Sequence, residues 1–340
     1  MSKATPPKSS IMSRRAALTT LANSLVALHP LIARTEGEAL PVLRVGKAVA
    51  RNIGFTPLDV GMEYGIFAQN GVAIEELNFA GGAKVAQAMA AGAVDISLSA
   101  GPDMAFSAKG APQIAIAAIT ESPAFMGYIV GRQSTARGSD DLRGKRIGIT
   151  SPGSLTDWLA EELNRVKGWT SDTDRVTKVA IGGSTQATIA ALKTGQVDAS
   201  IGAQEIGYQF EEQGQGRLVF DCAQYVGPIE FYTIFASTGL IQQRPDLVRR
   251  FLKAWLEAVA FMKTHKDDTV RVAAKVTGDP PAVTARAYDS LMSKYSSDGR
   301  FSAPALAKLA ASFNDRKTLD GTVDPKKLYT EEFLPAAAHD

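Results

Sequence analysis

Apolar and polar positions alternate in blocks over residues 43–260, and these blocks predict strands that are each followed by a helix. Short apolar runs bounded by glycine or polar residues favour buried strands. They occur at 43–46, 72–77, 94–98 and 114–119. Since strands that alternate with helices of about ten residues are typical of parallel sheets, the pattern predicts an α/β protein.

The residues between the strands also indicate where helices begin and end. A helix is predicted over Leu58–Asn70, because Pro57 precedes it and Gly71 follows it. Proline is favoured in the first turn of a helix, and glycine just after the last. From Pro245 onward the chain is largely helical, with one apolar face that we expect to pack as core. That face consists of Leu247, Val248, Phe251, Leu252, Trp255, Leu256 and Val259.

An internal repeat of helix, glycine and strand indicates two similar halves. Residues 88–97 and 191–200 are identical at five of ten positions, and each copy follows a glycine pair, Gly81-Gly82 or Gly182-Gly183. The alternative is chance, because such joints are common in α/β proteins. The copies lie 103 residues apart, which is too far for a solenoid repeat. We therefore predict two lobes of the same α/β build.

Two strand-like segments, 127–131 and 231–236, lie where such lobes would join. Both are rich in the aromatic and β-branched residues that strands favour. We therefore expect residues 40–130 and 237–340 to form lobe 1, including the C-terminal helices, and residues 131–236 to form lobe 2.

Residues 1–39 differ from the rest and predict an export signal peptide. A polar, basic start is followed by Arg14-Arg15, a mildly apolar run and a break. The arginine pair resembles a twin-arginine signal, although Ala17 stands where that pattern usually has phenylalanine, so the export route stays open. Cleavage is expected after Ala33 or Ala39. The alternative, ranked second, is a disordered basic N-terminus on a cytoplasmic protein.

The predicted leader would account for the excess of basic over acidic residues in the chain. The chain has 37 basic and 35 acidic residues, of which the leader holds five and two, so 32 and 33 remain. No basic field for nucleic acid remains, and no apolar run reaches the length of a membrane span. We therefore expect neither a nucleic-acid partner nor a direct membrane anchor.

Cysteine and histidine are too scarce for most metal or nucleophilic chemistry. The single cysteine, Cys222, rules out an internal disulfide and lies too far from the leader to be a lipidated N-terminal residue. One histidine, His265, lies in the body of the chain. A Cys/His metal site, a histidine-based triad, a phosphate-binding loop and a nucleophile turn are therefore not expected. We predict no catalytic residue, metal or cofactor.

Three stretches of sequence resemble a known family. They are the run from Ile53-Gly54-Phe55 through Gly61-Met62-Glu63-Tyr64-Gly65 to Val72, the two helix–Gly–x–Val–Asp joints, and Leu142–Ile149 followed by Pro152-Gly153-Ser154. In order and spacing they are similar to periplasmic solute-binding proteins of the nitrate/sulfonate/taurine type, the NMT1/THI5-like family. The resemblance covers residues 43–260.

The resemblance implies the type II fold of periplasmic binding proteins. Each lobe would be a mostly parallel sheet with helices on both faces, and two crossover strands would form the hinge of a ligand-binding cleft. It also implies a monomeric periplasmic protein that delivers a small solute to the permease and ATPase of an ABC importer. Enzymes on this fold that make thiamine precursors resemble the chain less, because their cysteine-rich motif and active histidine are missing. A regulator's sensing domain is disfavoured by the leader.

The candidate ligand-binding residues follow predicted strands or flank the crossovers. Ligands of open α/β sheets lie beyond the carboxyl ends of the strands, near helix starts. The candidates are Asn52, Phe55, Thr56, Ser99, Gly101, Ser122, Gly153, Ser154, Thr156, Gln204 and Glu230.

Several candidates have a purely structural alternative. Ser154 begins Ser154-Leu155-Thr156-Asp157, which is also a helix capping box. Ser99 and Gly101 precede a helix that begins at Pro102, and Gln204 is more simply explained as the polar start of a helix. Tyr225 and Tyr232 either line the cleft or pack in the hinge.

The predicted ligand is a small organic anion. Helix starts place partial positive charge and free N–H groups at the cleft, which suits a sulfonate, a taurine-like compound or an aromatic carboxylate against Phe55 or Tyr232. Asp103 and Asp157 are discounted, because acids are favoured in first helical turns. The alternative is a pyrimidine or another neutral or cationic heterocycle held by Glu230.

Overall fold

The computed structural model describes residues 39–315 and 324–336, and the elements given below belong to one compact unit, Leu40–Asp340. The predicted export signal lies outside the described residues except for Ala39, so export stays a prediction. Within the described ranges, no helix has both the length and the apolar character needed to span a bilayer.

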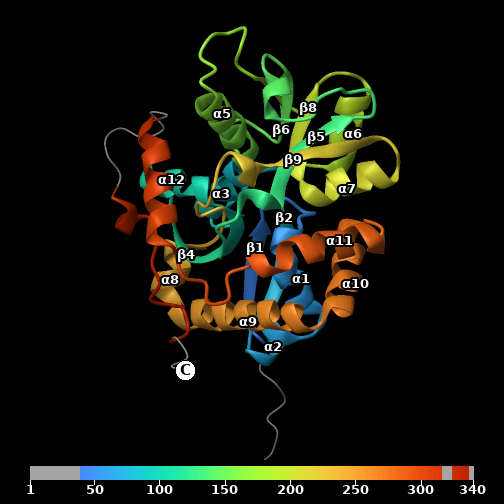
Figure 1. Cartoon of the computed structure of the whole chain (residues 1–340). Helices are drawn as coiled ribbons and strands as arrows, with labels where there is room; N and C mark the ends of the chain where they lie inside the picture. Colours follow the sequence, from blue (N-terminus) through green and yellow to red (C-terminus); the bar gives the residue numbers. More distant parts are fainter. Residues whose placement is uncertain (1–38, 316–323, 337–340) are drawn as a thin grey trace, which may run out of the picture. The chain divides into compact units, whose positions relative to one another are not determined.

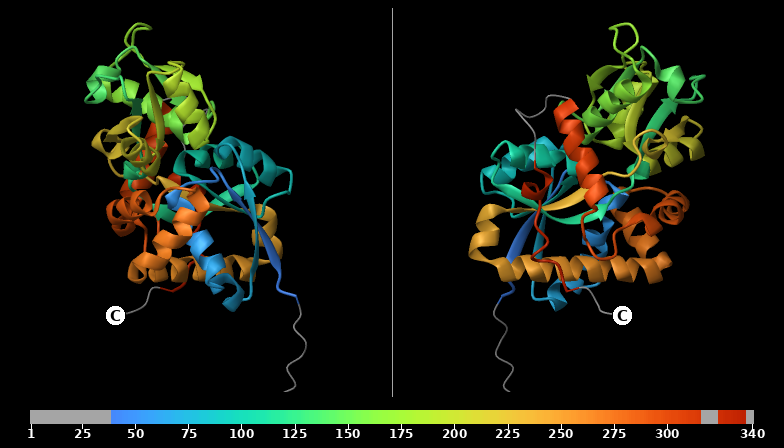
Figure 2. Two further views of the ribbon diagram at one scale, coloured as in Figure 1. Left: turned by 90° about the vertical axis from the view of Figure 1, so that its right-hand side faces the viewer. Right: turned by 60° about the vertical axis from the view of Figure 1, so that its left-hand side comes forward.

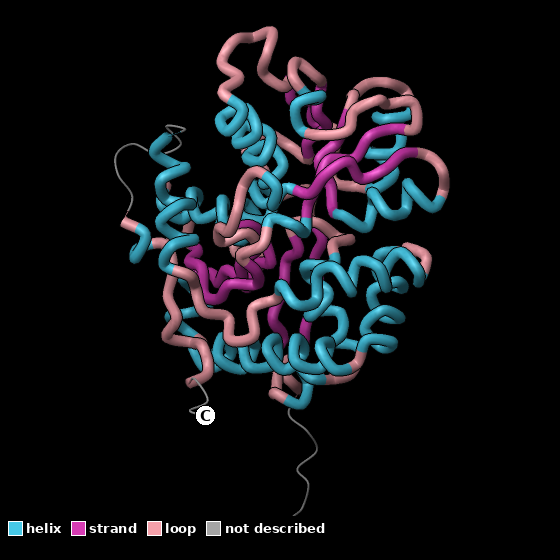
Figure 3. The backbone as a smooth tube through the Cα atoms, viewed as in Figure 1, coloured by secondary structure: helices cyan, strands magenta, loops and turns pink. Residues whose placement is uncertain are grey.

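The described strands form two separate five-stranded sheets (Figures 1 and 3). In the first sheet, of order β2-β1-β3-β10-β4, β1 runs parallel to β2 and β3, while β10 runs antiparallel to β3 and β4. The strands are β1 Val42–Lys47, β2 Ala73–Asn78, β3 Ile96–Ala100, β4 Gln113–Thr120 and β10 Tyr232–Ser237.

The second sheet repeats this arrangement. Its order is β7-β6-β8-β5-β9, with β6 parallel to β7 and β8, and β5 antiparallel to β8 and β9. All five residues of β3 and of β8 are buried, so both faces of each central strand are covered. The predicted fold of two mostly parallel sheets is confirmed. The strands are β5 Met126–Gly131, β6 Arg146–Ile149, β7 Thr177–Ala180, β8 Ala199–Ala203 and β9 Gly216–Asp221.

The chain exchanges sheets about one strand earlier than the predicted lobe boundaries. It leaves the first sheet after Thr120, and β5 already pairs with β8 and β9. It leaves the second sheet after Asp221, and β10 already pairs with β3 and β4. Each crossover strand thus completes the sheet that it enters, because pairing on both edges satisfies its backbone groups. We call residues 121–125 and 222–231 the first and second crossings.

The repeated joints take the same form in both sheets. Helices α3 (Gly82–Ala90) and α6 (Thr185–Lys193) are followed by Gly92 and Gly195, with φ of 73° and 68°, and then by β3 and β8. This left-handed conformation favours glycine. The helix, glycine and strand predicted for each copy are therefore present.

One predicted helix is two helices. In place of a single helix over Leu58–Asn70, α1 (Thr56–Glu63) and α2 (Ile66–Gln69) are separated at Gly65, whose φ is 68°. A left-handed residue cannot continue a right-handed helix. The helical prediction was therefore wrong at this point, although its start and end lie close to the observed ones.

Helix α9 (Pro245–Thr264) lies on the side of the first sheet that faces away from the second sheet (Figures 1 and 2). Its predicted apolar face is buried except for the partly buried Leu256, and the ring of Phe251 lies 5.4 Å from that of Phe67 in α2. The remaining α-helices are α4 Met104–Ala108, α5 Leu155–Lys167, α7 Gln204–Glu212, α8 Thr238–Gln243, α10 Lys266–Thr277, α11 Pro281–Leu291 and α12 Ala303–Asp315. The 3₁₀ turns are η1 Ile53–Phe55, η2 Gly101–Asp103, η3 Pro123–Phe125, η4 Ser139–Leu142, η5 Cys222–Gln224, η6 Met292–Lys294 and η7 Pro325–Lys327.

Candidate functional site

A cavity of about 40 Å³ lies between the two sheets, at the ends of β1, β3 and β6. Ligands of open α/β sheets bind at this end of the strands. Five of the predicted site residues line this inter-sheet cavity: Asn52, Phe55, Ser99, Ser154 and Thr156. The other lining residues are Ala48, Val49, Gly81, Gly82, Ala100, Asp103, Met126, Thr150, Leu155 and Tyr232.

Asn52 and Tyr232 form one wall of the cavity. The Asn52 Oδ1 atom accepts a hydrogen bond from the N–H of Gly54 at 2.7 Å, and its Nδ2 atom donates to the Tyr232 hydroxyl at 2.8 Å. A Cβ on Gly54 would lie 2.6 Å from the Tyr232 ring, so only glycine fits there. The rings of Phe55 and Tyr232 lie 5.1 Å apart. The loop after β1 is therefore fixed against the start of β10, and it presents an aromatic surface.

Asp103 places a buried carboxyl group in the cavity wall. Its Oδ2 atom accepts hydrogen bonds from the hydroxyl of Ser99 and, at 3.4 Å, from the N–H of Ala100. Its Oδ1 atom is buried and has no hydrogen-bond partner among the described residues. Burial raises the pKa of Asp103 to about 6. The sequence analysis discounted this residue, but a buried unpartnered oxygen is costly and indicates a missing donor.

The start of α3 approaches that carboxyl group closely. A Cβ on Gly82 would collide with the carboxyl of Asp103, and a Cβ on Gly81 would lie 3.0 Å from the Ser151 hydroxyl. The glycine pair therefore lets the start of α3 meet Asp103 on one side and the loop after β6 on the other. Because a carboxylate at a helix N-terminus is favourable, Asp103 already occupies the place of an anion there.

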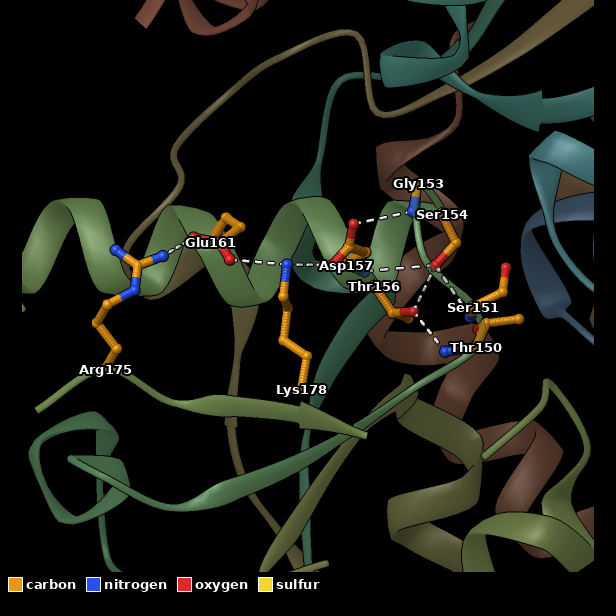
Figure 4. A network of polar contacts seen from close by, with 9 residues as sticks. All are labelled: Thr150, Ser151, Gly153, Ser154, Thr156, Asp157, Glu161, Arg175 and Lys178. Atoms are coloured by element: carbon orange, nitrogen blue, oxygen red, sulfur yellow. Dashed lines mark hydrogen bonds and ion pairs between the residues drawn. The ribbon is translucent and has the colours of Figure 1, made fainter. Parts of the chain in front are cut away.

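The loop after β6 uses its hydroxyl groups to shape itself (Figure 4). Ser154 Oγ accepts from the N–H of Asp157 at 3.4 Å and lies 2.9 Å from Thr156 Oγ1, which accepts from the N–H of Thr150 at 2.7 Å. Ser154 is thus the N-cap of α5, as the structural alternative predicted. The N–H groups of the first turn of a helix have no hydrogen-bond acceptor within the helix. Those of Leu155 and Thr156 belong to residues that line the cavity.

Ion pairs hold the first turns of α5 against β7 (Figure 4). The Lys178 ammonium lies 2.6 Å from Asp157 Oδ1 and 2.7 Å from Glu161 Oε1, and Glu161 also binds Arg175. Asp157 further accepts a hydrogen bond from the N–H of Gly153 at 2.8 Å. The direction in which the α5 N-terminus points is therefore set from outside the cavity.

Six predicted site residues lie outside the cavity lining. Gly153 lines a separate groove, and its φ of 75° explains why it is glycine. Thr56 is buried at the start of α1. Gly101 packs against the backbone of Glu230, where a Cβ would collide with the carbonyl oxygen. Ser122 caps η3 by accepting from the N–H of Ala124 at 3.3 Å.

Gln204 has the structural role that the sequence favoured. Its Nε2 donates to the carbonyl of Ala124 and its Oε1 accepts from the Tyr208 hydroxyl. Glu230 lies at the second crossing, wholly buried, with Oε1 accepting from the N–H of Ser302 at 2.7 Å and Oε2 without a partner in the described structure. Burial raises the pKa of Glu230 to about 8.

Glu205, the second residue of α7, links loops of the two sheets. Its Oε1 atom accepts from the N–H of Ile53 at 3.0 Å, across 152 residues of sequence. The hydroxyl of Tyr295 donates to the carbonyl of Ile53, so both backbone polar groups of this residue are held by side chains. The Oε2 atom of Glu205 is buried without a partner in the described ranges, and burial raises its pKa to about 7.

The described residues contain no group of three or more His, Cys, Asp or Glu side chains placed to hold a metal ion. The cavity instead combines helix-start N–H groups, one aromatic wall and one buried carboxyl group. That set is suited to binding a small polar solute by hydrogen bonds. The described lining contains no cysteine, histidine or lysine that would serve as a nucleophile or base.

Solved structures with this fold include binding proteins and an enzyme. The alkanesulfonate-binding protein SsuA from Xanthomonas axonopodis pv. citri, bound to MOPS, is 21% identical with a TM-score of 0.70, and covers 86% of this chain and 100% of its own. The aliphatic sulphonate-binding SsuA from Escherichia coli is 18% identical, with a TM-score of 0.68 and coverage of 86% and 98%. The desulfurization enzyme DSZB is 17% identical, with a TM-score of 0.60 and coverage of 86% and 97%.

These identities show a shared fold, that of periplasmic binding proteins. No curated protein sequence matches the chain. The sequence model described as NMT1/THI5 like matches residues 52–269, which is more than half of the chain. The resemblance found in the sequence is thus confirmed, and the chain belongs to the NMT1/THI5-like family.

Proposed function

We propose that this protein is the periplasmic capture subunit of an ABC importer, which binds a small solute in the inter-sheet cavity and delivers it to a permease and its ATPase. The observation that carries the proposal is the lining of the cavity, which comes from the strand ends of both sheets. Family membership and the sulfonate-binding proteins of the same fold support it.

Binding then requires the two sheets to move apart. Sites for small organic ligands usually have about 300–1,000 Å³, whereas this cavity has about 40 Å³. The described arrangement is therefore a closed one that leaves room for little more than water. The two crossings are the covalent links between the sheets, so they are the natural hinge. The free protein in solution should therefore populate an open arrangement that admits the ligand, and saturating ligand should shift it toward closure and reduce the radius of gyration measured by solution scattering. An unchanged radius would oppose the hinge.

The ligand that fits best carries both an acidic group and an amino group. The first-turn N–H groups of α5 favour an anion, while Asp103 Oδ1 lacks a hydrogen-bond donor. A purely anionic ligand would meet the Asp103 carboxylate at close range. The predicted organic anion is accordingly narrowed to an aminosulfonate or amino carboxylate of the taurine type. A heterocycle with N–H donors is the second candidate, because it would also satisfy Asp103.

Calorimetric titration with matched compounds tests this assignment. Taurine should bind, whereas ethanesulfonate and ethylamine, each lacking one of its two groups, should bind at least about tenfold more weakly. Replacing Asp103 by Asn should weaken the binding of taurine by about the same factor, and Asp267→Asn, at an exposed position of α10, should not. Preferential binding of an aminopyrimidine would favour the second candidate. Binding of ethanesulfonate as tight as taurine would refute a role for Asp103.

Export and partner proteins need separate evidence. Protein made in its native host should begin between Arg34 and Leu40, as measured by N-terminal sequencing. Genes for a permease and an ATPase should lie near the gene for this protein. An intact Met1 on protein from the cytoplasm would contradict the periplasmic assignment while leaving solute binding to be judged by titration.

A further inference from the structure

A second cavity of about 550 Å³ lies at the two crossings and is far larger than the inter-sheet cavity. Its volume falls in the range of small-molecule sites. Its walls come from three parts of the chain: Glu121–Pro123 in the first crossing, Ala223 and Gly227-Pro228 in the second, and residues 294–302 before α12. We call it the crossover pocket. Nothing in the proposed capture function uses it.

The crossover pocket contains one acidic and one basic side chain without partners. Arg300 is bound to Glu331 at 2.9 Å, and Asp298 accepts hydrogen bonds from the Ser296 hydroxyl and the N–H of Arg300. By contrast, the half-buried side chains of Glu121 and Lys294 form no hydrogen bond or ion pair with any described residue, including each other. One carboxylate and one ammonium are therefore free to pair with the charges of a ligand.

The rest of the pocket wall is largely apolar. Tyr295, Phe301, Pro123 and Pro228 are among its lining residues. Ser302 also lines the pocket, and its N–H binds Glu230 directly behind the wall. The pocket thus combines two unpaired, opposite charges with an aromatic surface. The buried carboxyl of Glu230, in the second crossing, lies behind its wall.

We propose that the crossover pocket binds a small zwitterion with an apolar side chain, of the class of apolar α-amino acids. The ammonium group of the ligand pairs with Glu121 and its carboxylate with Lys294, while the side chain packs against Phe301. Charge-assisted hydrogen bonds of this kind are among the stronger polar contacts. Glu121 belongs to the first crossing and Lys294 to η6, so the two charges come together only in the folded protein.

Because both crossings line the pocket, its shape depends on the hinge. A ligand that fits one hinge angle better than another shifts the population toward that angle. By linkage, the ligand of the inter-sheet cavity and the ligand of the crossover pocket then change each other's affinity by the same factor. This coupling rests on the proposed capture function, whereas binding to the crossover pocket does not.

Calorimetry with phenylalanine as the probe tests the site on the full mature chain. Phenethylamine and phenylpropionate lack its carboxylate and its ammonium, and both should bind at least about tenfold more weakly, a loss of about 1.4 kcal/mol. The substitutions Glu121→Gln and Lys294→Met should each weaken the binding of phenylalanine by a similar factor. The matched controls Glu212→Gln and Lys193→Met, both exposed in the second-sheet half, should not.

Three results would overturn the proposal. They are the absence of phenylalanine binding at millimolar concentration by protein that melts cooperatively, equal binding by the pocket and control variants, and equal binding of the three probes. The coupling is tested by repeating the taurine titration in saturating phenylalanine, and an unchanged taurine affinity would refute it. Loss of taurine binding alone, with phenylalanine still bound, would count against the capture proposal and leave the crossover pocket intact.

Discussion

The two sheets are alike near the start of β1 and β6 and differ three residues later. Arg44 at the start of β1 binds Asp95, and Arg146 at the start of β6 binds Asp198, each through its backbone N–H and its guanidinium. These aspartates are the Asp of the two Val–Asp joints. The geometry is the same in both halves, so the aspartate of each joint anchors the neighbouring strand, β1 or β6.

The difference appears at the cavity end of the same strands. In β1 the strand ends on Lys47, which is 1% exposed and lies 2.7 Å from Asp59 of α1 and 3.1 Å from Glu76 of β2. In β6 the corresponding residue is the buried Ile149. The first half therefore fixes α1 by a buried ion pair. In the second half, the apolar side chain of Ile149 packs at this position. Helix α5 is held instead by the ion pairs of Lys178 outside the cavity.

Replacing Lys47 by Met should give the largest effect on stability. It leaves Asp59 buried without its cation, and breaking a buried pair typically costs about 3–5 kcal/mol. Burial raises the pKa of Asp59 to about 6 even beside Lys47, so the loss should be greatest at pH 8 and smaller at pH 5, where Asp59 takes up a proton. Urea unfolding at both pH values measures it.

The matched change in the second half is Ile149→Val, which should cost only about 0.5–1.5 kcal/mol at either pH. The double variant Lys47→Met with Asp59→Leu should recover much of the lost stability, because no buried charge remains. If Lys47→Met proved as mild as Ile149→Val at pH 8, the buried pair would not distinguish the two halves.

Glu205 provides the second test, because it is a buried carboxyl of the second half that has no cation. Burial raises its pKa to about 7, above the usual value for Glu, so the folded protein binds more protons than the unfolded chain between about pH 4.5 and 7. Its contribution to stability is fully present below that window and is lost as the pH rises through 7. Glu205→Gln should reduce this loss by on the order of 3 kcal/mol.

The measurement is the free energy of unfolding at pH 5, 6, 7 and 8 for the wild type and for Glu205→Gln. Asp103 and Glu230 titrate in the same direction in both proteins, so the difference between the two curves isolates Glu205. Parallel curves would mean that Glu205 is not a buried charge in the folded protein.

These buried groups also mark the limit of what the sequence could predict. The joints at Gly92 and Gly195 were predictable, because a helix, a left-handed glycine and a strand form a local pattern. Asn52, Ser99 and Ser154 were placed at the cavity because each follows a strand. The contact from Glu205 to Ile53 could not be predicted, since it spans 152 residues and Glu205 has the local pattern of any helix start.

Asp103 and Lys47 were missed for related reasons. An acid after Gly101-Pro102 looks like an ordinary first-turn residue, and only the approach of Gly82 from another helix reveals its burial. Lys47 is a charged residue at the end of a strand, which suggests an exposed side chain. In the structure, residues of α1 and β2 cover it. The break at Gly65 was missed because glycine is tolerated inside helical patterns. Apart from the break at Gly65, which is local, these errors concern burial by residues that are distant in sequence.

The two Asp clamps should respond similarly, with the first slightly more sensitive. The Asp95 side chain is 19% exposed and that of Asp198 is 36% exposed. Each aspartate also accepts from the backbone N–H of its arginine, so replacement by Ala leaves that donor unpaired. We expect a loss of about 2 kcal/mol for Asp95→Ala and about 1 kcal/mol for Asp198→Ala. Chemical denaturation measures the loss of stability in both variants. If one variant lost no stability, the two joints would not be equivalent.

Lys178→Met should have the smallest effect, although Lys178 and Lys47 both hold a helix start beside the cavity. Lys178 binds Asp157 and Glu161 with 30% of its side chain exposed, against 1% for Lys47. The side chains of Asp157 and Glu161 are 19% and 27% exposed, so water screens them more than it screens Asp59, and removing the cation should cost about 1 kcal/mol or less. The cost should shrink further in 1 M NaCl, where the screening length is about 3 Å. Urea unfolding of both lysine variants at low and high salt tests this, because only the exposed pairs should respond to salt. A salt-independent loss of several kcal/mol for Lys178→Met would show that burial does not explain the difference between the two halves.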